Sequence, residues 1–288
     1  MIGTGTLCMI LVFVMCGGGK IIAQTAEPWE NIAIETVEKV VPASGTTPEY
    51  VILEKTQYSL SKFAKDKDGY YILFDGKTLN GWRGYTRDNI PAKWIVDETE
   101  GAIKFDSKGG EGQQRSGGDL IFGRKFRNFE LSIDWKCSKG ANSGIFYLAQ
   151  EIRRQAIYIS SPESQVLDNE NHPDAKLGEN GNRKSSSLYD MIPAIPQNAN
   201  PFGEWNNTTI VVNNGNITHF QNGVKVLEYQ MWTPQWTELL QKSKFSQEKW
   251  PLAFELLKNC GGPNREGYIG LQDHGDDVWF RNIKIKIL

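Results

Sequence analysis

Residues 128–137 read NFELSIDWKC, and the alternation in this stretch decides the fold class. Every second side chain is apolar, and these are Phe129, Leu131, Ile133, Trp135 and Cys137. The residues between them are polar or charged. Because successive side chains of a β-strand point to opposite faces, the stretch predicts a strand with one face in a core and the other toward solvent.

The pattern continues on both sides of this strand. From residue 70 onward, short strand-like runs are separated by Gly, Asn and Asp, which is the spacing of an all-β sandwich. Residues 217–221 and 224–229 flank Asn222-Gly223. This pair tolerates positive φ, so it predicts a hairpin with a type I′ turn.

The last strand is expected in residues 278–287 and contains a slip in phase. Its alternation breaks after Phe280 and resumes at Ile283. A β-bulge near Arg281-Asn282 would bring both halves onto the same face of a sheet.

Three segments of different character make up the chain. Residues 1–23 are expected to be a signal peptide, residues 24–69 an N-terminal extension, and residues 70–288 one β-sandwich domain. Within that domain, residues 230–266 lose the alternation and carry Trp232 among other bulky apolar residues, which predicts a short helical or irregular insertion.

The first residues predict export. Residues 7–15 are apolar but too short to span a bilayer, and small Ala23 suits the last position before cleavage. We therefore expect a periplasmic or cell-envelope protein of a bacterium, with no stable membrane span after processing. A retained anchor and a lipid anchor through Cys16 are the alternatives.

Composition excludes some functions. The net charge is −2, and no basic cluster stands out, which argues against nucleic acid as a partner. Cys137 and Cys260 remain after processing, either as a disulfide or as free thiols. No zinc-type cysteine spacing is present.

One polar segment could carry chemistry. Read as a strand, residues 163–168 place Glu163 and Gln165 on one face, with Asp168 on the other. A carboxylate and a carboxamide would then project together, either into a polar groove or toward solvent. His172 follows in a loop that could fold back over the same face.

Three histidines are present, at positions 172, 219 and 274, and a base with a pKa near neutrality would most simply be one of them. His274 lies in a polar loop between two strands, beside Asp273, where functional groups concentrate. His219 alternates with apolar residues of the hairpin and is expected to be structural.

Several stretches together resemble the 3-keto-disaccharide hydrolase family. They are 73–82 (LFDGKTLNGW), 142–146 (NSGIF), 163–169 (ESQVLDN) with His172, 188–190 (LYD), 203–206 (GEWN), 270–275 (GLQDHG) and 280–283 (FRNI). The resemblance covers roughly residues 70–288 and implies a concanavalin A-like jelly-roll sandwich. Ser164 departs from the family pattern, which has an aromatic residue there.

The resemblance implies hydrolysis of glycosides oxidised at C3, or hydration of the keto-glycal that elimination leaves. Glu163 is the expected acid/base and His274 the second proton-transfer group. The expected substrate-positioning residues are Gln165, Asp168, His172, Tyr189, Arg281 and Trp232. A divalent cation near Asp168, His172 or Asp273 could serve the enolate, although the spacing establishes no metal site.

Two other readings stay open at this point. A conventional glycosidase needs two facing carboxylates, but Glu163 and Asp168 are five residues apart and would face opposite ways on one regular strand. A non-catalytic carbohydrate-binding, lectin-like envelope module would use the same sandwich.

Overall fold

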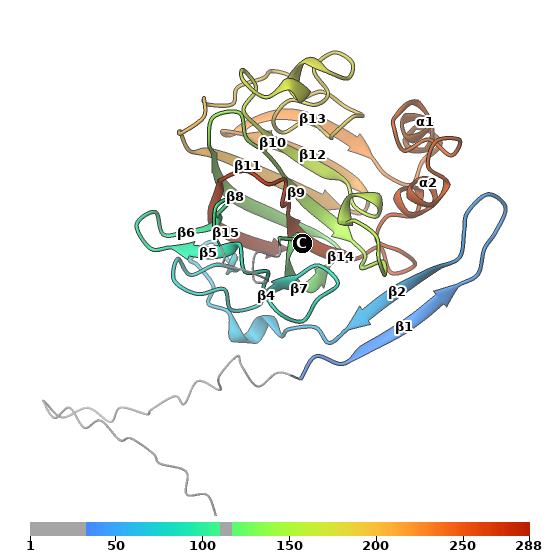
Figure 1. Ribbon diagram of the computed structural model, residues 1–288, viewed down its shortest axis with the longest axis horizontal. Helices are drawn as coiled ribbons and strands as arrows, with labels where there is room; N and C mark the ends of the chain where they lie inside the picture. Colours follow the sequence, from blue (N-terminus) through green and yellow to red (C-terminus); the bar gives the residue numbers. More distant parts are fainter. Residues whose placement is uncertain (1–32, 110–116) are drawn as a thin grey trace, which may run out of the picture. The chain divides into compact units, whose positions relative to one another are not determined.

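The computed structural model describes residues 33–109 and 117–288. The expected signal peptide lies outside the described residues. In the part that is described, no helix is long and apolar enough to cross a membrane. The chain forms two stacked antiparallel sheets with the main hydrophobic core between them, which confirms the predicted all-β sandwich (Figure 1).

The larger sheet has eight strands. Its order is β13 (Val224–Gln230), β12 (Asn216–Gln221), β11 (Asn206–Asn213), β8 (Phe129–Cys137), β15 (Val278–Ile287), β6 (Ala102–Phe105) and β5 (Trp94–Asp97), with β3 (Tyr71–Ile72) paired to β15. The predicted strand is therefore the centre of the sheet. Its five apolar side chains are all buried, as the alternation required.

The smaller sheet has five strands and carries the polar segment. Its order is β10 (Glu163–Leu167), β9 (Asn142–Ala149), β14 (Gly267–Leu271), β7 (Leu120–Phe126) and β4 (Trp82–Gly84). One face packs on the larger sheet. The other face holds a second, smaller apolar cluster, and we call it the outer face.

Both local turn predictions are confirmed. Asn222 and Gly223 have φ of 49° and 78° and join β12 to β13, as a type I′ turn requires. In β15 the register shifts between Arg281 and Lys284, and Asn282 has a φ of 50°. The bulge keeps the apolar side chains on both sides of it in the core.

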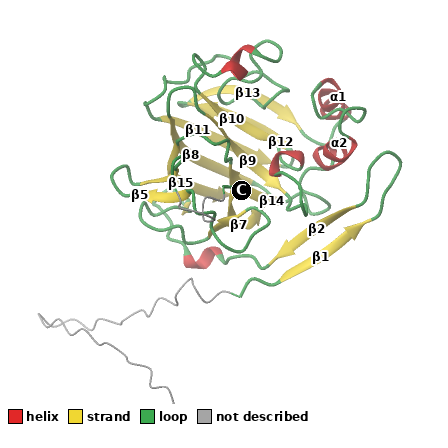
Figure 2. Cartoon of the chain, viewed as in Figure 1, coloured by secondary structure: helices red, strands yellow, loops and turns green. Residues whose placement is uncertain are grey.

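The predicted insertion contains two helices, α1 (Pro234–Lys242) and α2 (Pro251–Lys258). Each begins with proline, whose fixed φ suits the first helical position. Trp236 is fully buried, and its Nε1 donates to Leu257 O at 3.0 Å. Figure 2 shows these two helices as the main helical elements of a molecule built of strands.

The residues before the sandwich form a hairpin of β1 (Thr36–Val41) and β2 (Tyr50–Lys55). It is tied to residues 151–153 by backbone hydrogen bonds: Leu53 N donates to Glu151 O, and Arg153 N donates to Val51 O, each at 2.9 Å. Three short 3₁₀ turns complete the described elements, η2 (Leu60–Lys62), η4 (Ile157–Ile159) and η5 (Pro173–Lys176).

A buried ion pair lies on the outer face beneath this hairpin. Nη1 and Nη2 of Arg83 each donate to one carboxylate oxygen of Glu151 at 2.7 Å, and both side chains are almost completely shielded from solvent. Thr86 N adds a third bond to the same carboxylate at 2.7 Å. The carboxylate is thus held by three donors.

Cys137 and Cys260 are both buried and free. Cys137 lies in β8, and the thiol of Cys260 points toward the carbonyl oxygens of Leu148 and Ser160, at 3.8 and 3.9 Å. Of the two alternatives, the structure contains free thiols.

Candidate active site

Glu163 and Gln165 lie on the outer face of the smaller sheet, as the strand pattern predicts. Val166, between Gln165 and Leu167, belongs to the core between the sheets. The face is not a solvated one, however, because Glu163 is 7% exposed and Gln165 is fully buried. A buried carboxyl group that makes no ion pair within the described residues points to function rather than to a solvated surface.

The neighbouring strand makes room for the Glu163 carboxyl group. Gly144 of β9 is the register partner of Gln165, and a Cβ atom on Gly144 would lie 2.7 Å from Glu163 Cδ. With its amide nitrogen turned toward acceptors, Gln165 donates to Glu163 Oε1 at 3.1 Å and to Ser143 O at 2.8 Å. Burial raises the pKa of Glu163 to about 8, against the opposing effect of Lys244. At neutral pH this carboxyl group is therefore mostly protonated.

Replacing Gly144 with Ala should displace this carboxyl group. We expect kcat/KM to fall by about 10²-fold, because a misplacement of about 1 Å in a catalytic group has effects of this size. The control is Ser164→Ala, since that side chain points to the opposite face and its buried hydroxyl has no hydrogen-bond partner among the described residues. Equal activity of the two variants, at unchanged melting temperature, would contradict the placement of Glu163.

A loop with an ionic network covers the free edge of β10. Tyr189 N donates to Glu163 O at 3.0 Å, and the Tyr189 hydroxyl donates to Asp174 Oδ2 at 2.9 Å. Arg183 binds Asp174 and Asp190 at 2.8 and 2.7 Å. Tyr189, a predicted site residue, is thus brought next to Glu163.

Lys244, from the insertion, completes this side of the site. Its Nζ lies 4.3 Å from the ring centre of Tyr189, 5.0 Å from that of Phe245 and 5.4 Å from that of Tyr158. Burial lowers its pKa, while the charge of Glu163 acts in the opposite direction. No sequence pattern indicated Lys244, because it lies in a segment without regular alternation.

Asp119 and Asp273 shape the turn that carries His274. Asp273 N donates to Asp119 Oδ1 at 3.0 Å, and Gly118 N donates to Asp273 Oδ2 at 2.6 Å. Burial raises the pKa of Asp119 to about 7, opposed by the bond from Asp273 N–H. Asp119 was missed in the sequence because it stands alone, immediately before β7. The Asp273 carboxylate accepts hydrogen bonds from backbone N–H groups and so stabilises the turn.

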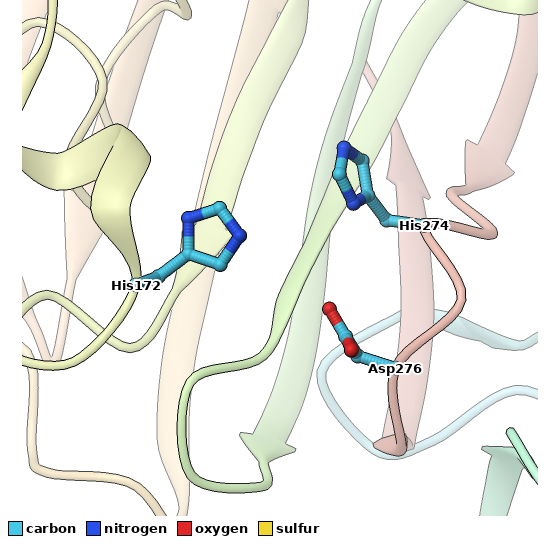
Figure 3. A group of neighbouring side chains, drawn as sticks. All are labelled: His172, His274 and Asp276. Atoms are coloured by element: carbon cyan, nitrogen blue, oxygen red, sulfur yellow. The ribbon is translucent and has the colours of Figure 1, made fainter.

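His172 and His274 meet across the end of the site, together with Asp276 (Figure 3). One potential ligand atom of each lies within 4.8 Å of the others. His172 comes from the start of η5, whereas His274 and Asp276 come from the loop between β14 and β15. Two imidazoles and a carboxylate are a donor set that suits a divalent transition-metal ion with open coordination positions.

Hydrogen bonds around this group show what cation binding would require. Asn142 N donates to Asp276 Oδ2 at 3.0 Å, which holds the carboxylate in place. Asp174 N donates to Nδ1 of His172 at 3.1 Å, so in the neutral ring Nε2 carries the proton. Binding of a cation at Nε2 would move that proton to Nδ1 and displace the Asp174 bond. The donor set and the spacing fit if this bond is displaced and, for a cation at Nε2 of His274, if the Asn142 amide 3.4 Å from that nitrogen also moves.

Three predicted site residues do not join the site. The Asp168 carboxylate accepts hydrogen bonds from Gly140 N at 2.8 Å and from the Asn171 side-chain amide at 2.7 Å, so it stabilises the loop before His172. Trp232 donates through Nε1 to Cys260 O at 3.1 Å and lines a different pocket. The guanidinium carbon of Arg281 lies 3.8 Å from the ring centre of Trp205, on the solvent side of the larger sheet. Arg281 follows buried Phe280 in the alternation of β15, before the bulge, and therefore faces away from the core.

Comparisons with known proteins identify relatives of this chain. The sequence pattern of the 3-keto-alpha-glucoside-1,2-lyase-like domain matches residues 69–286. A protein of Bacteroides thetaiotaomicron named 3-keto-disaccharide hydrolase is 64% identical in an alignment of 233 residues, which covers 77% of this chain and 80% of that protein. The chain belongs to the 3-keto-disaccharide hydrolase family.

A crystal structure supports the fold. It is of a protein from Parabacteroides distasonis named as a candidate glycosyl hydrolase, with 29% identity and a TM-score of 0.62 over 77% of this chain and 94% of that one. The resemblance expected from the sequence is confirmed. The protein is a glycoside hydrolase-like enzyme, a carbohydrate hydrolase of the 3-keto-disaccharide hydrolase family.

Proposed function

We propose that this member of the 3-keto-disaccharide hydrolase family cleaves glycosides oxidised at C3 and that Glu163 is the base that acts at C2. The observation that supports this most is the buried Glu163 carboxyl group with its raised pKa, held by Gln165 and lying beside Gly144 of the neighbouring strand. A desolvated carboxylate is a stronger base than an exposed one, and a pKa near the working pH suits a group that must both take up and return a proton.

The chemistry of a 3-keto sugar explains what such a base would do. The C3 ketone acidifies the C2 proton, so that Glu163 can remove it and leave an enolate. The enolate then expels the oxygen at C1 and forms a keto-glycal. Return of the proton to C2 and addition of water at C1 complete a net hydrolysis.

The enolate oxygen needs a positive partner. His172, His274 and Asp276 would hold a divalent cation, which when bound would polarise the C3 oxygen. In this proposal His274 is a ligand rather than the second proton-transfer group, because His172 and Asp276 both face it. The positions of His172 and Asp276 support a ligand role for His274, although the sequence alone suggested proton transfer.

The experiment compares matched disaccharides with and without the 3-keto group, using purified protein and mass spectrometry of the products. We expect release from the keto substrate alone, loss of release after treatment with chelator, and recovery with added Mn²⁺. Calorimetric titration of Mn²⁺ into wild type and His274→Ala gives a second readout, with binding lost in the variant.

Two results would reverse the proposal. Cleavage of the unoxidised disaccharide would favour a conventional glycosidase, although the Asp168 carboxylate is occupied by its own loop. Sugar binding with no product from either substrate would favour a binding module. Full activity after chelation, with no Mn²⁺ binding, would show that no cation takes part. The ring N–H of His172 would then be the donor to the enolate oxygen.

A further inference from the structure

A pocket of about 510 Å³ opens between the loop that covers β10 and the insertion. This size lies within the range of small-molecule sites. Its lining includes Arg183 and Asp190 from the loop and Leu239, Lys242, Lys244 and Lys249 from the insertion. Lys244 belongs both to this pocket and to the surroundings of Glu163, so the pocket adjoins the base.

Lys244 is held firmly at this junction. Its backbone N–H donates to Asp190 Oδ2 at 2.8 Å, and three aromatic rings surround its ammonium group. Within the described ranges 33–109 and 117–288, Nζ makes no ion pair, whereas Arg183 is paired with Asp174 and Asp190, and Lys242 with Glu238 at 2.7 Å. Lys244 thus keeps N–H donors available for a ligand.

The pocket and the histidine group lie toward opposite ends of β10. Glu163 pairs with Phe146 at one end of the strand, and Leu167 pairs with Asn142 at the other. The Glu163 carboxyl group lies beside Gly144 of β9, and the two residues of strand from Gly144 to Asn142 span about 7 Å. Asn142 contacts the histidine group through Asp276 and His274. A sugar ring over Glu163 would therefore have the histidine group on one side and Lys244 on the other.

We propose that this pocket is the leaving-group subsite and that Lys244 Nζ protonates the oxygen that departs from C1. The inference rests on the proposed function, because it takes Glu163 as the base and the histidine group as the partner of the C3 oxygen. With those two positions occupied, the C1 oxygen points toward Lys244 and the aglycone enters the pocket.

The protons and electrons of the step balance. Glu163 takes the C2 proton, and the C2–H electron pair forms the enolate. When the ketone re-forms, that pair becomes the C1=C2 bond, the C1–O bond breaks with its electrons on oxygen, and Lys244 supplies a proton to give a neutral alcohol. In the hydration step water adds OH to C1 and its other proton returns to Lys244, while Glu163 returns its proton to C2.

The test uses leaving groups of different basicity on the same 3-keto-glucoside. Lys244→Met keeps the length of the side chain and removes the charge, and Lys258→Met, on the exposed side of α2, is the matched control. For an alkyl glycoside, Lys244→Met should lose about 10²–10⁴-fold in kcat, as for a general acid. For a nitrophenyl glycoside, whose leaving oxygen needs no proton, the loss should stay below about tenfold.

The outcomes separate the two proposals. An equal loss for every leaving group would overturn the role of Lys244 while the enolate route stands. So would a borohydride-trapped sugar on Lys244, because it would show that Nζ attacks the C3 ketone instead. A wild-type protein inactive on every 3-keto-glycoside would refute the proposed function itself.

Discussion

Replacement of Glu163 by Gln should lower kcat/KM for a 3-keto-glycoside by about 10²–10⁴-fold, the usual contribution of a general base. Glutamine has nearly the same shape and can still bond to Gln165, so the site should remain folded. Steady-state kinetics and thermal unfolding of the variant and of Ser164→Ala measure the two effects separately. Full activity of Glu163→Gln would exclude the catalytic role without affecting membership of the family.

The pH profile tests the direction in which the Glu163 proton moves. Burial raises the pKa of Glu163 to about 8, so the ionised base is the minor form at pH 7. The kcat/KM of wild type should therefore rise with pH and level off above about pH 8. The rise should be absent from the residual activity of Glu163→Gln. With a nitrophenyl glycoside, whose leaving oxygen needs no proton from Lys244, a profile that falls above this pH would show that the protonated form acts, and Glu163 would then be the acid.

Strand alternation allowed much of the fold to be predicted, because a strand with one buried face leaves a period of two in the sequence. The central strand, the Asn222-Gly223 hairpin and the bulge at Asn282 all follow from local chemistry. The same logic placed Glu163 and Gln165 on one face. Their burial could not be predicted, because it depends on the loop and the insertion, which are distant in sequence.

The rest of the site depends on contacts between segments that are distant in the sequence, and no local sequence pattern predicts such contacts. Asp276 meets His172 only because the β14–β15 loop lies against the start of η5, and Lys244 meets Glu163 only through the fold of the insertion. Arg281 shows the opposite case. Its motif suggested a site residue, but the register of β15 directs its side chain to the other side of the sandwich.

The second large effect expected concerns stability. Glu151→Ala should lower the free energy of unfolding by about 3–5 kcal/mol, the cost of leaving one member of a buried ion pair without its partner. Arg83 would lose both of its 2.7 Å bonds to the carboxylate, and its Nε has no hydrogen-bond partner among the described residues. Urea unfolding measures the change, with Glu238→Ala, which breaks an exposed pair on α1, as a control expected to show little effect.

A double variant separates the charge from the packing at this position. Arg83→Met combined with Glu151→Leu removes both charges and keeps apolar volume, so it should be more stable than Glu151→Ala alone. If the double variant were as unstable as the single one, the bond from Thr86 N to the Glu151 carboxylate, which both variants lose, would be the main source of the lost stability. The ion pair lies beside Tyr85, whose hydroxyl donates to Gln150 O and accepts from Ile152 N, each at 2.9 Å. Loss of the ion pair should therefore loosen the segment that holds β2. Hydrogen exchange at Leu53 N–H should then become faster under conditions in which the sandwich as a whole stays folded.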